Sequence, residues 1–361
     1  MFDWMRGKKR GVIKVGSWKE TVENPLNLRI YREEIKDHIP DELLDFHIHI
    51  FNDKSVPLND RGFELPGVFI REYTVSELKN DLNNIYPGKK CRGVIFGLPD
   101  KKYNHEVNND YILENSDLNE LYPLRLVKPD ESPEFLKDEL IKSKFLGIKP
   151  YPDYVSWKNV EDVEIFDMVP HEHMEIVNSL GLIVMLHIPR NGRLADPLNQ
   201  KQLVELAINY PKAKIVIAHI GRAYYLKNIM GNIEKIAPYE NIYCDITMVN
   251  NWEVMEYLFN HFDHSRILYG TDIPIGLCGG KSVEINDQYT YVTSKPWKLS
   301  ISDDHNKLIF TSFIYEEIRA ILKAIERCGL RESFVESLFF KNGMFLLNEV
   351  KQKKPPDIIS N

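Results

Sequence analysis

The sequence Asp45-Phe46-His47-Ile48-His49-Ile50-Phe51 places two histidines one residue apart inside an apolar run. Side chains of a strand alternate between its two sides, so His47 and His49 point one way while Ile48 points the other. Two imidazoles on one face of a strand can bind a single metal ion. We therefore predict a strand in this segment that carries two metal ligands.

A second pair of histidines with the same spacing leads to the opposite prediction. His171 and His173 follow Pro170, in a segment that reads as the start of a helix. Positions i and i+2 of a helix diverge around its axis and do not face each other. We therefore do not expect this pair to share a metal ion.

Composition limits the classes of protein that the chain can belong to. It has 361 residues, 43% hydrophobic and 27% charged, which is a soluble globular balance. The net charge of −7 argues against nucleic acid as the main partner, and the short basic cluster at residues 6–10 reads as a solvated tail. We expect no signal peptide and no membrane span. The scattered cysteines form no CxxC pair and fit a reducing cytoplasm; they are Cys91, Cys244, Cys278 and Cys328.

Short apolar runs alternate with amphipathic helical stretches between about residues 91 and 272. Runs rich in Val and Ile with little alternation are typical of parallel strands covered on both faces. After the strand that holds His47, the expected strands are Arg92–Leu98, Tyr122–Val127, Phe145–Lys149, Leu182–His187, Lys214–His219, Ile242–Thr247 and Arg266–Thr271.

Eight strands at intervals of about 32 residues predict an α/β fold, specifically a (β/α)₈ TIM barrel. A doubly wound open sheet is the main rival, but it requires a Gly-rich turn after the first strand, and the sequence has none. Helix signals fall between the strands: Ser132 caps a helix that begins at Pro133, and Gly181 ends another.

We expect three parts: an N-terminal extension at 1–40, a barrel domain at 41–350 and a polar, frayed tail at 351–361. Long connections follow the first strand (51–90) and the eighth (273–310, with a hairpin near 282–294). Such loops lie over the mouth of a barrel, where active sites form. Tyr289 and Trp297 in the second loop are candidates to cover the pocket.

Residues able to bind a metal gather at the C-terminal ends of the expected strands, which meet at one rim of a barrel. They are His47, His49, Lys149, His187, His219 and Asp272. A chance distribution would place histidines in helices and loops as well as at strand ends. Five further histidines, which we expect in surface or loop positions, are His38, His105, His261, His264 and His305.

These residues stand in motifs that resemble the amidohydrolase superfamily. The closest likeness is to the amidohydrolase-2 branch, which includes aminocarboxymuconate-semialdehyde decarboxylase. The resemblance covers roughly residues 44–348 and rests on the segments 45–49, 147–150, 184–187, 217–221, 268–274 and 341–347. The residues after Pro274 carry no family motif and leave the substrate open.

The resemblance implies that His47, His49, His187 and Asp272 hold a divalent metal, with His219 beside it. Three imidazoles and one carboxylate suit Zn²⁺, with Mn²⁺ as the alternative. Lys149 has two readings by resemblance: a carbamate that bridges two metals, or an ammonium beside a single metal. We favour one metal per chain. A plain ion pair with a nearby carboxylate is the remaining reading for Lys149.

Arg190 and Arg222 each follow a strand-end histidine by three residues and can reach the mouth of the barrel. Guanidinium groups bind carboxylates through paired hydrogen bonds, so we predict a small carboxylate-bearing substrate. A salt bridge to a neighbouring loop is an equally good reading for either arginine alone. Arg193 is a weaker third candidate.

The leading functional prediction is a metal-dependent hydrolase that cleaves a C–N or C–O bond of an amide, cyclic amide or lactone. In it, Asp272 shuttles the proton of the attacking water and His219 orients water or steadies the oxyanion. The alternative is a non-oxidative decarboxylase of an unsaturated or aromatic acid on the same metal site. A non-catalytic binding barrel would predict a broken ligand set. Barrels of the resembled family are often dimers, so a homodimer is an expectation by analogy alone.

Overall fold

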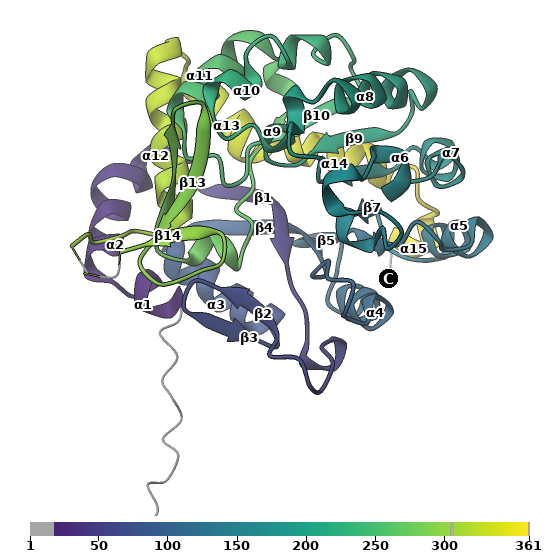
Figure 1. The fold of residues 1–361 in the computed structure, drawn as a ribbon, viewed down its shortest axis with the longest axis horizontal. Coiled ribbons are helices and arrows are strands. Elements are labelled where there is room, and N and C mark those ends of the chain that lie inside the picture. The colour runs from purple at the N-terminus through teal and green to yellow at the C-terminus, as the bar shows by residue number, and fades with distance from the viewer. Residues whose placement is uncertain (1–17, 304, 306, 360–361) are drawn as a thin grey trace, which may run out of the picture.

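The computed structural model describes residues 18–303, 305 and 307–359, so the basic cluster at residues 6–10 lies outside the described residues. Two parallel sheets form the centre of the molecule (Figure 1). The three-stranded sheet has the order β1 (Glu42–His49), β4 (Lys90–Phe96), β5 (Leu121–Pro123). The six-stranded sheet has the order β11-β10-β9-β8-β7-β6. Its strands are β6 (Arg125–Val127), β7 (Gly147–Pro150), β8 (Ile183–Leu186), β9 (Lys214–Ile217), β10 (Ile242–Asp245) and β11 (Ile267–Leu268).

Backbone hydrogen bonds join the two sheets at both edges. Strands β5 and β6 are separated only by Leu124, whose N–H donates to the carbonyl of Ile95 at 2.9 Å. At the other edge, Phe46 N–H donates to Tyr269 O at 2.8 Å and His49 N–H to Ile273 O at 2.9 Å. The predicted α/β fold with parallel strands is therefore confirmed, and each expected strand is found within a few residues of its expected bounds.

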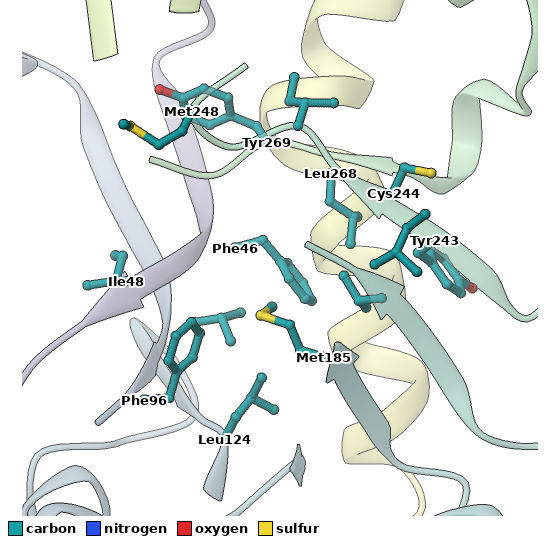
Figure 2. Packing of buried hydrophobic residues seen from close by; sticks show 14 of the residues in the cluster. Phe46, Ile48, Phe96, Leu124, Met185, Tyr243, Cys244, Met248, Leu268 and Tyr269 are labelled. Atoms are coloured by element: carbon teal, nitrogen blue, oxygen red, sulfur yellow. The ribbon is translucent and has the colours of Figure 1, made fainter. Parts of the chain in front are cut away.

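The strands form because their apolar residues are buried on both faces. All four residues of β8 are buried, and neighbouring strands contribute the same kind of side chain. Figure 2 shows Phe46, Leu124, Met185 and Leu268 in one buried cluster, although three of them come from different strands and Leu124 lies between β5 and β6. This packed interior fixes the strand ends from which the site is built.

Helices surround the strands in Figure 1. Ser132 caps the first turn of α5, where its Oγ accepts from Phe135 N–H at 3.3 Å, and Gly181 ends α7 with a left-handed φ of 64°. His171 and His173 lie in the first turn of α7, as predicted. The helices between the strands are α3 (Val75–Ile85), α4 (His105–Glu114), α5 (Pro133–Lys142), α6 (Ile165–Met168), α7 (His171–Leu180), α8 (Pro197–Asn209), α9 (His219–Arg222), α10 (Leu226–Ile229) and α11 (Trp252–His261).

The segments outside this alternation also form regular structure. The extension contains α1 (Trp18–Val22) and α2 (Pro25–Ile30), and the C-terminal helices are α12 (Phe313–Cys328), α13 (Glu332–Glu336), α14 (Asn342–Lys351) and α15 (Pro356–Ile359). Within the polar tail, Lys354 is only 6% exposed and donates to Leu140 O and, at 3.4 Å, to Ser143 O, so the expectation of fraying is wrong at this residue.

The two long connections contact each other. The first contains the hairpin β2 (Phe63–Leu65) and β3 (Val68–Ile70); the second contains the predicted hairpin as β12 (Gly280–Ile285) and β13 (Gln288–Thr293), with β14 (Ser300–Ser302) beside β13. Trp297 Nε1 donates to Glu64 O at 3.2 Å. No helix in the described part of the chain combines the length and apolar character needed to cross a membrane.

Candidate metal centre and substrate cavity

Two imidazoles and one carboxylate converge where β1 meets the segment after β11. His49 Nε2 lies 3.2 Å from Asp272 Oδ1, and His47 Nε2 lies 3.6 Å from the same oxygen. The backbone brings them together, because Asp272 N–H donates to His47 O at 2.9 Å. The alternation of the strand thus places both imidazoles on one side, as the sequence predicts.

The other nitrogen of each imidazole in this pair is already committed. His47 Nδ1 lies 2.6 Å from Asp245 Oδ2, and His49 Nδ1 donates to Gly97 O at 2.9 Å. Because a carbonyl can only accept, the proton of neutral His49 sits on Nδ1, and the Asp245 carboxylate favours the same tautomer in His47. The Nε2 lone pairs therefore face the oxygen of Asp272. Three acceptors at this separation call for a positive charge between them.

His219 and His187 complete a cluster of four imidazoles. The rings of His47 and His219 lie 4.9 Å apart and those of His187 and His219 lie 5.5 Å apart. His219 Nδ1 donates to Thr247 O at 3.0 Å, which leaves its Nε2 unprotonated. The buried Nδ1 of His187 has no hydrogen-bond partner among the described residues. The cluster therefore offers nitrogen lone pairs that the protein alone does not satisfy.

Burial keeps His47, His187 and His219 neutral. Removal from water, with the nearby charge of Lys149 in addition, lowers the pKa of His47 to about 3. Burial likewise lowers the pKa values of His187 and His219. For Asp272, burial alone would raise the pKa, but the contact with His49 and the neighbouring imidazoles lowers it below the usual carboxyl range. Neutral imidazoles beside an ionised carboxylate are the protonation states that a divalent cation requires.

Lys149 is fully buried next to this cluster but forms no ion pair with any residue that the structure describes. Its Nζ has no hydrogen-bond partner among the described residues and lies 4.8 Å from the centre of the Phe96 ring. Burial lowers its pKa to about 8, against the opposing effect of the Asp245 and Asp272 carboxylates. The simple carboxylate pairing considered for Lys149 is therefore not found.

A cavity of about 810 Å³ opens onto the cluster. The predicted site residues among its lining are His47, His49, His187, His219, Arg222 and Asp272. Tyr289 and Trp297 also line it, as expected for covering aromatics. Lys149 and Arg190 are absent from this lining. The five histidines expected elsewhere do not line it either. His105 Nε2 instead lies 3.0 Å from Glu106 Oε1 and 3.2 Å from Glu131 Oε1.

The structure separates the two predicted arginines. Arg222 faces the cavity, where it donates to Ile188 O at 3.1 Å and has no carboxylate within ion-pair distance among the described residues. Arg190 Nε instead lies 3.0 Å from Asp196 Oδ2. Arg190 thus has the salt bridge to a neighbouring loop that was the alternative reading, because Asp196 caps α8 only six residues away.

Left-handed backbone is concentrated around the cavity. Five of its non-glycine lining residues have positive φ: Arg193 (55°), His219 (57°), Arg222 (62°), Met248 (60°) and Asp272 (58°). They follow β8, β9, β10 and β11. Each such residue costs roughly 1–3 kcal/mol, and they occur where function requires a particular side-chain direction. The strain supports a functional role for this cavity.

Asp245 is the site residue that the sequence analysis missed. It ends β10 fully buried, and its Oδ1 accepts from Thr247 N–H at 2.8 Å while Oδ2 contacts His47. Burial alone would raise the pKa of the Asp245 carboxyl, but the contacts with His47 and Thr247 lower it below the usual carboxyl range, so Asp245 is ionised. A carboxylate within the apolar run Ile242-Tyr243-Cys244-Asp245-Ile246 was an available signal, since such a residue is almost never buried without a partner.

Comparison with known proteins agrees with the fold and, between residues 105 and 278, with the family resemblance. The amidohydrolase family profile matches residues 105–278, slightly less than half of the chain, and the resemblance to the amidohydrolase-2 branch is confirmed. No curated protein sequence matches the chain.

Several solved structures share the fold over most of the chain. A probable 2-pyrone-4,6-dicarboxylic acid hydrolase from Acinetobacter baumannii, with citric acid bound, is 16% identical (TM-score 0.51; 85% of this chain and 99% of that one). A zinc-bound amidohydrolase from Burkholderia multivorans is 12% identical (TM-score 0.52; 85% and 99%). A 5-carboxyvanillate decarboxylase from Sphingomonas paucimobilis is 11% identical (TM-score 0.51; 86% and 99%). These relatives are enzymes, and at such identities they establish the fold alone.

Proposed function

We propose that this chain is a metal-dependent hydrolase of a small carboxylate-bearing substrate, cleaving a C–N or C–O bond of an amide, cyclic amide or lactone. One observation carries the proposal. The Nε2 atoms of His47 and His49 and the Oδ1 of Asp272 converge while the Nδ1 atoms of both imidazoles are committed to other partners. Neither Nε2 carries a proton that could hydrogen-bond to Asp272. A bound cation would therefore be needed to hold the three acceptors together.

The residues fit one divalent ion, Zn²⁺ or alternatively Mn²⁺. Among the described residues, the ligand atoms of His47, His49 and Asp272 all lie within 4.8 Å of one another, and these three would hold the ion. We propose His187 as the fourth ligand: its ligand nitrogens lie outside that 4.8 Å group, but its buried Nδ1 has no hydrogen-bond partner among the described residues. When bound, such an ion supplies Lewis acidity, which acidifies water and polarises a carbonyl group. The zinc-bound relative supports a divalent metal in this fold.

The protein residues then handle the protons. Asp272 is ionised, so it can accept the proton of the attacking water and return it to the leaving group. His219 presents an unprotonated Nε2, because its Nδ1 proton goes to Thr247 O. A neutral acceptor orients a water molecule well but donates nothing to an oxyanion. Of the two roles considered for His219, we therefore propose water orientation.

Substrate binding and metal number complete the proposal. Arg222 faces the cavity without a carboxylate partner among the described residues, so it would bind the substrate carboxylate. We propose a single metal ion, with Lys149 outside its ligands as an uncharged or ammonium side chain. Elemental analysis that finds two ions per chain would instead assign Lys149 as a bridging carbamate.

A non-oxidative decarboxylase is the second candidate, because a structural relative is a decarboxylase and the same ligands serve both reactions. The two are distinguished by products. The zinc-loaded chain is incubated with carboxylate-bearing lactones and cyclic amides, and separately with aromatic and unsaturated acids. A new carboxylate supports hydrolysis, and released CO₂ supports decarboxylation. Retention of activity after complete chelation of the metal would overturn both.

Asp272→Asn provides the complementary test of the proton role. We expect it to reduce turnover far more than substrate binding, because the amide does not accept the water proton. Turnover near that of the wild type would remove the proposed role of Asp272.

We also propose that the two sheets form one closed (β/α)₈ barrel. The hydrogen bonds at both edges support this, since β5 continues through Leu124 into β6 and β1 is bonded to residues 269–273 after β11. A closed barrel would explain why side chains from β1 and from the segment after β11 meet at one rim. Strong amide-exchange protection of Phe46 and Leu124, equal to that of mid-sheet residues, is the expected result.

A further inference from the structure

Arg193 is a second cation of the cavity that, within the described part of the chain, lacks an anionic partner. Its guanidinium carbon lies 4.3 Å from the ring centre of Tyr289 and 5.8 Å from that of Tyr224. Among the described residues no carboxylate lies within ion-pair distance of it, and its buried Nε has no hydrogen-bond partner. The side chain is thus held in place by aromatic rings, while its donors are left for something else.

Arg190, three residues earlier, provides an internal contrast. It has the same left-handed backbone, with φ of 63° against 55° for Arg193. Its Nε is neutralised by Asp196 at 3.0 Å, and it does not line the cavity. The absence of a carboxylate beside Arg193 is therefore not a general property of this loop.

Two tyrosines connect Arg193 to the metal centre. The Tyr224 and Tyr289 rings stack at 4.5 Å with an interplanar angle of 27°, and the Tyr224 ring lies 6.1 Å from that of His219. Tyr289 belongs to β13, in the long connection after β11, beyond the segment that matches the family profile. This connection therefore supplies the residue on which the guanidinium of Arg193 rests.

We propose that Arg193, positioned by Tyr289, forms a second anion subsite that takes a carboxylate or phosphate group of the substrate away from the metal centre. The proposal rests on the proposed function and narrows its substrate class to molecules with two anionic groups, one for Arg222 and one for Arg193. A guanidinium stacked on a ring keeps its N–H edges free for bidentate hydrogen bonds to such a group.

The test compares three rigid probes with the same ring: benzoate, terephthalate and 4-phosphonobenzoate. Binding to the zinc-loaded chain is measured by calorimetry for the wild type and for Arg193→Met, Arg193→Lys and Arg190→Met. In the wild type and in Arg190→Met, we expect at least one doubly anionic probe to bind about tenfold or more tightly than benzoate. The better of the two identifies the second group as carboxylate or phosphate.

Arg193→Met should abolish this advantage, and Arg193→Lys, which keeps the charge, should retain part of it. Tyr289→Phe should preserve the advantage and Tyr289→Leu should reduce it, because the ring rather than the hydroxyl positions Arg193. Equal binding of all three probes by the wild type, or an advantage that survives Arg193→Met, would overturn the subsite. Because binding is measured without turnover, the absence of hydrolysis with the advantage intact would refute the proposed function alone.

Discussion

Replacing Asp245 with Asn should weaken metal binding although Asp245 itself holds no metal. The backbone N–H groups of Thr247 (2.8 Å) and His219 (3.4 Å) both donate to Asp245 Oδ1. These two donors would keep the oxygen of the new amide at that position. Its NH₂ group would then replace Oδ2 and face His47 Nδ1, so the imidazole would have to accept there and carry its proton on Nε2. That tautomer has no lone pair to offer the ion.

The magnitude follows from the geometry of this contact. The distance from Nδ1 of His47 to Oδ2 of Asp245 is 2.6 Å, and both side chains are at most 2% exposed, so water does not replace the lost partner. Removing a hydrogen-bond partner of a metal-binding histidine lowers metal affinity by about 10–100-fold. This corresponds to about 1.4–2.7 kcal/mol of binding free energy. The folded metal-free protein should also lose roughly 1–3 kcal/mol of stability, because a buried charged hydrogen bond is broken.

The assay is a competition titration of Zn²⁺ against a chromophoric chelator, together with denaturant unfolding of the metal-free protein. Asp81→Asn is the matched control: Asp81 is equally buried and accepts from Tyr73 Oη at 2.9 Å, but it does not line the cavity. The control should lose stability without a change in metal affinity. A folded Asp245→Asn protein that binds Zn²⁺ within twofold of the wild type would refute the tautomer argument.

Three further perturbations test other parts of the structure. His187→Ala should lower the metal content by elemental analysis, whereas His173→Ala, at a buried histidine outside the cavity, should not; equal metal content in His187→Ala and the wild type would remove His187 from the ligands. Gly147→Ala should destabilise the fold by roughly 1–3 kcal/mol, because the new Cβ would lie 2.2 Å from Ile183 O; an unchanged denaturation midpoint would contradict this packing. Burial lowers the pKa of Lys354 from 10.5 to about 8. Between these pH values the unfolded state binds more protons than the folded state, so the stability of the wild type relative to Lys354→Met should rise with pH by up to about 3 kcal/mol. A difference in unfolding free energy that does not change with pH would contradict the burial of the amine.

The strands and the metal-binding residues could be predicted because each leaves a local signal. A run of Val and Ile buried on both faces reveals a parallel strand, and a histidine at the end of such a run reveals a rim position. Asp245 left a signal of the same kind, a carboxylate in an apolar strand, but its partner His47 is 198 residues away. The local sequence pattern could therefore predict that Asp245 is buried, but not that it pairs with His47.

Contacts that form only between distant loops were beyond reach. Asp196 lies close to both Arg190 and Arg193 in the sequence and does not show which of them it pairs with; in the structure it pairs with Arg190, whereas Arg193 rests on Tyr289 of the distant second connection. The same holds for Lys354, whose polar neighbours predict fraying although its amine reaches the end of α5. In each case the outcome depends on which groups the folded chain places within a few ångströms.

The two His-x-His pairs show how secondary structure, and not spacing, decides what a histidine pair does. In β1, the pleat directs His47 and His49 to the same side, and both Nε2 atoms approach one oxygen of Asp272. In α7, the helix turns the rings apart: His171 Nδ1 pairs with Tyr210 Oη at 2.7 Å, while His173 Nε2 donates to Glu131 O at 2.9 Å. Each histidine of the helical pair forms its own structural hydrogen bond, whereas the Nε2 lone pairs of His47 and His49 both face Asp272 Oδ1. A motif of this kind therefore predicts a metal site only together with the strand that aligns it, and moving the pair by one residue along β1 would turn both imidazoles into the apolar layer.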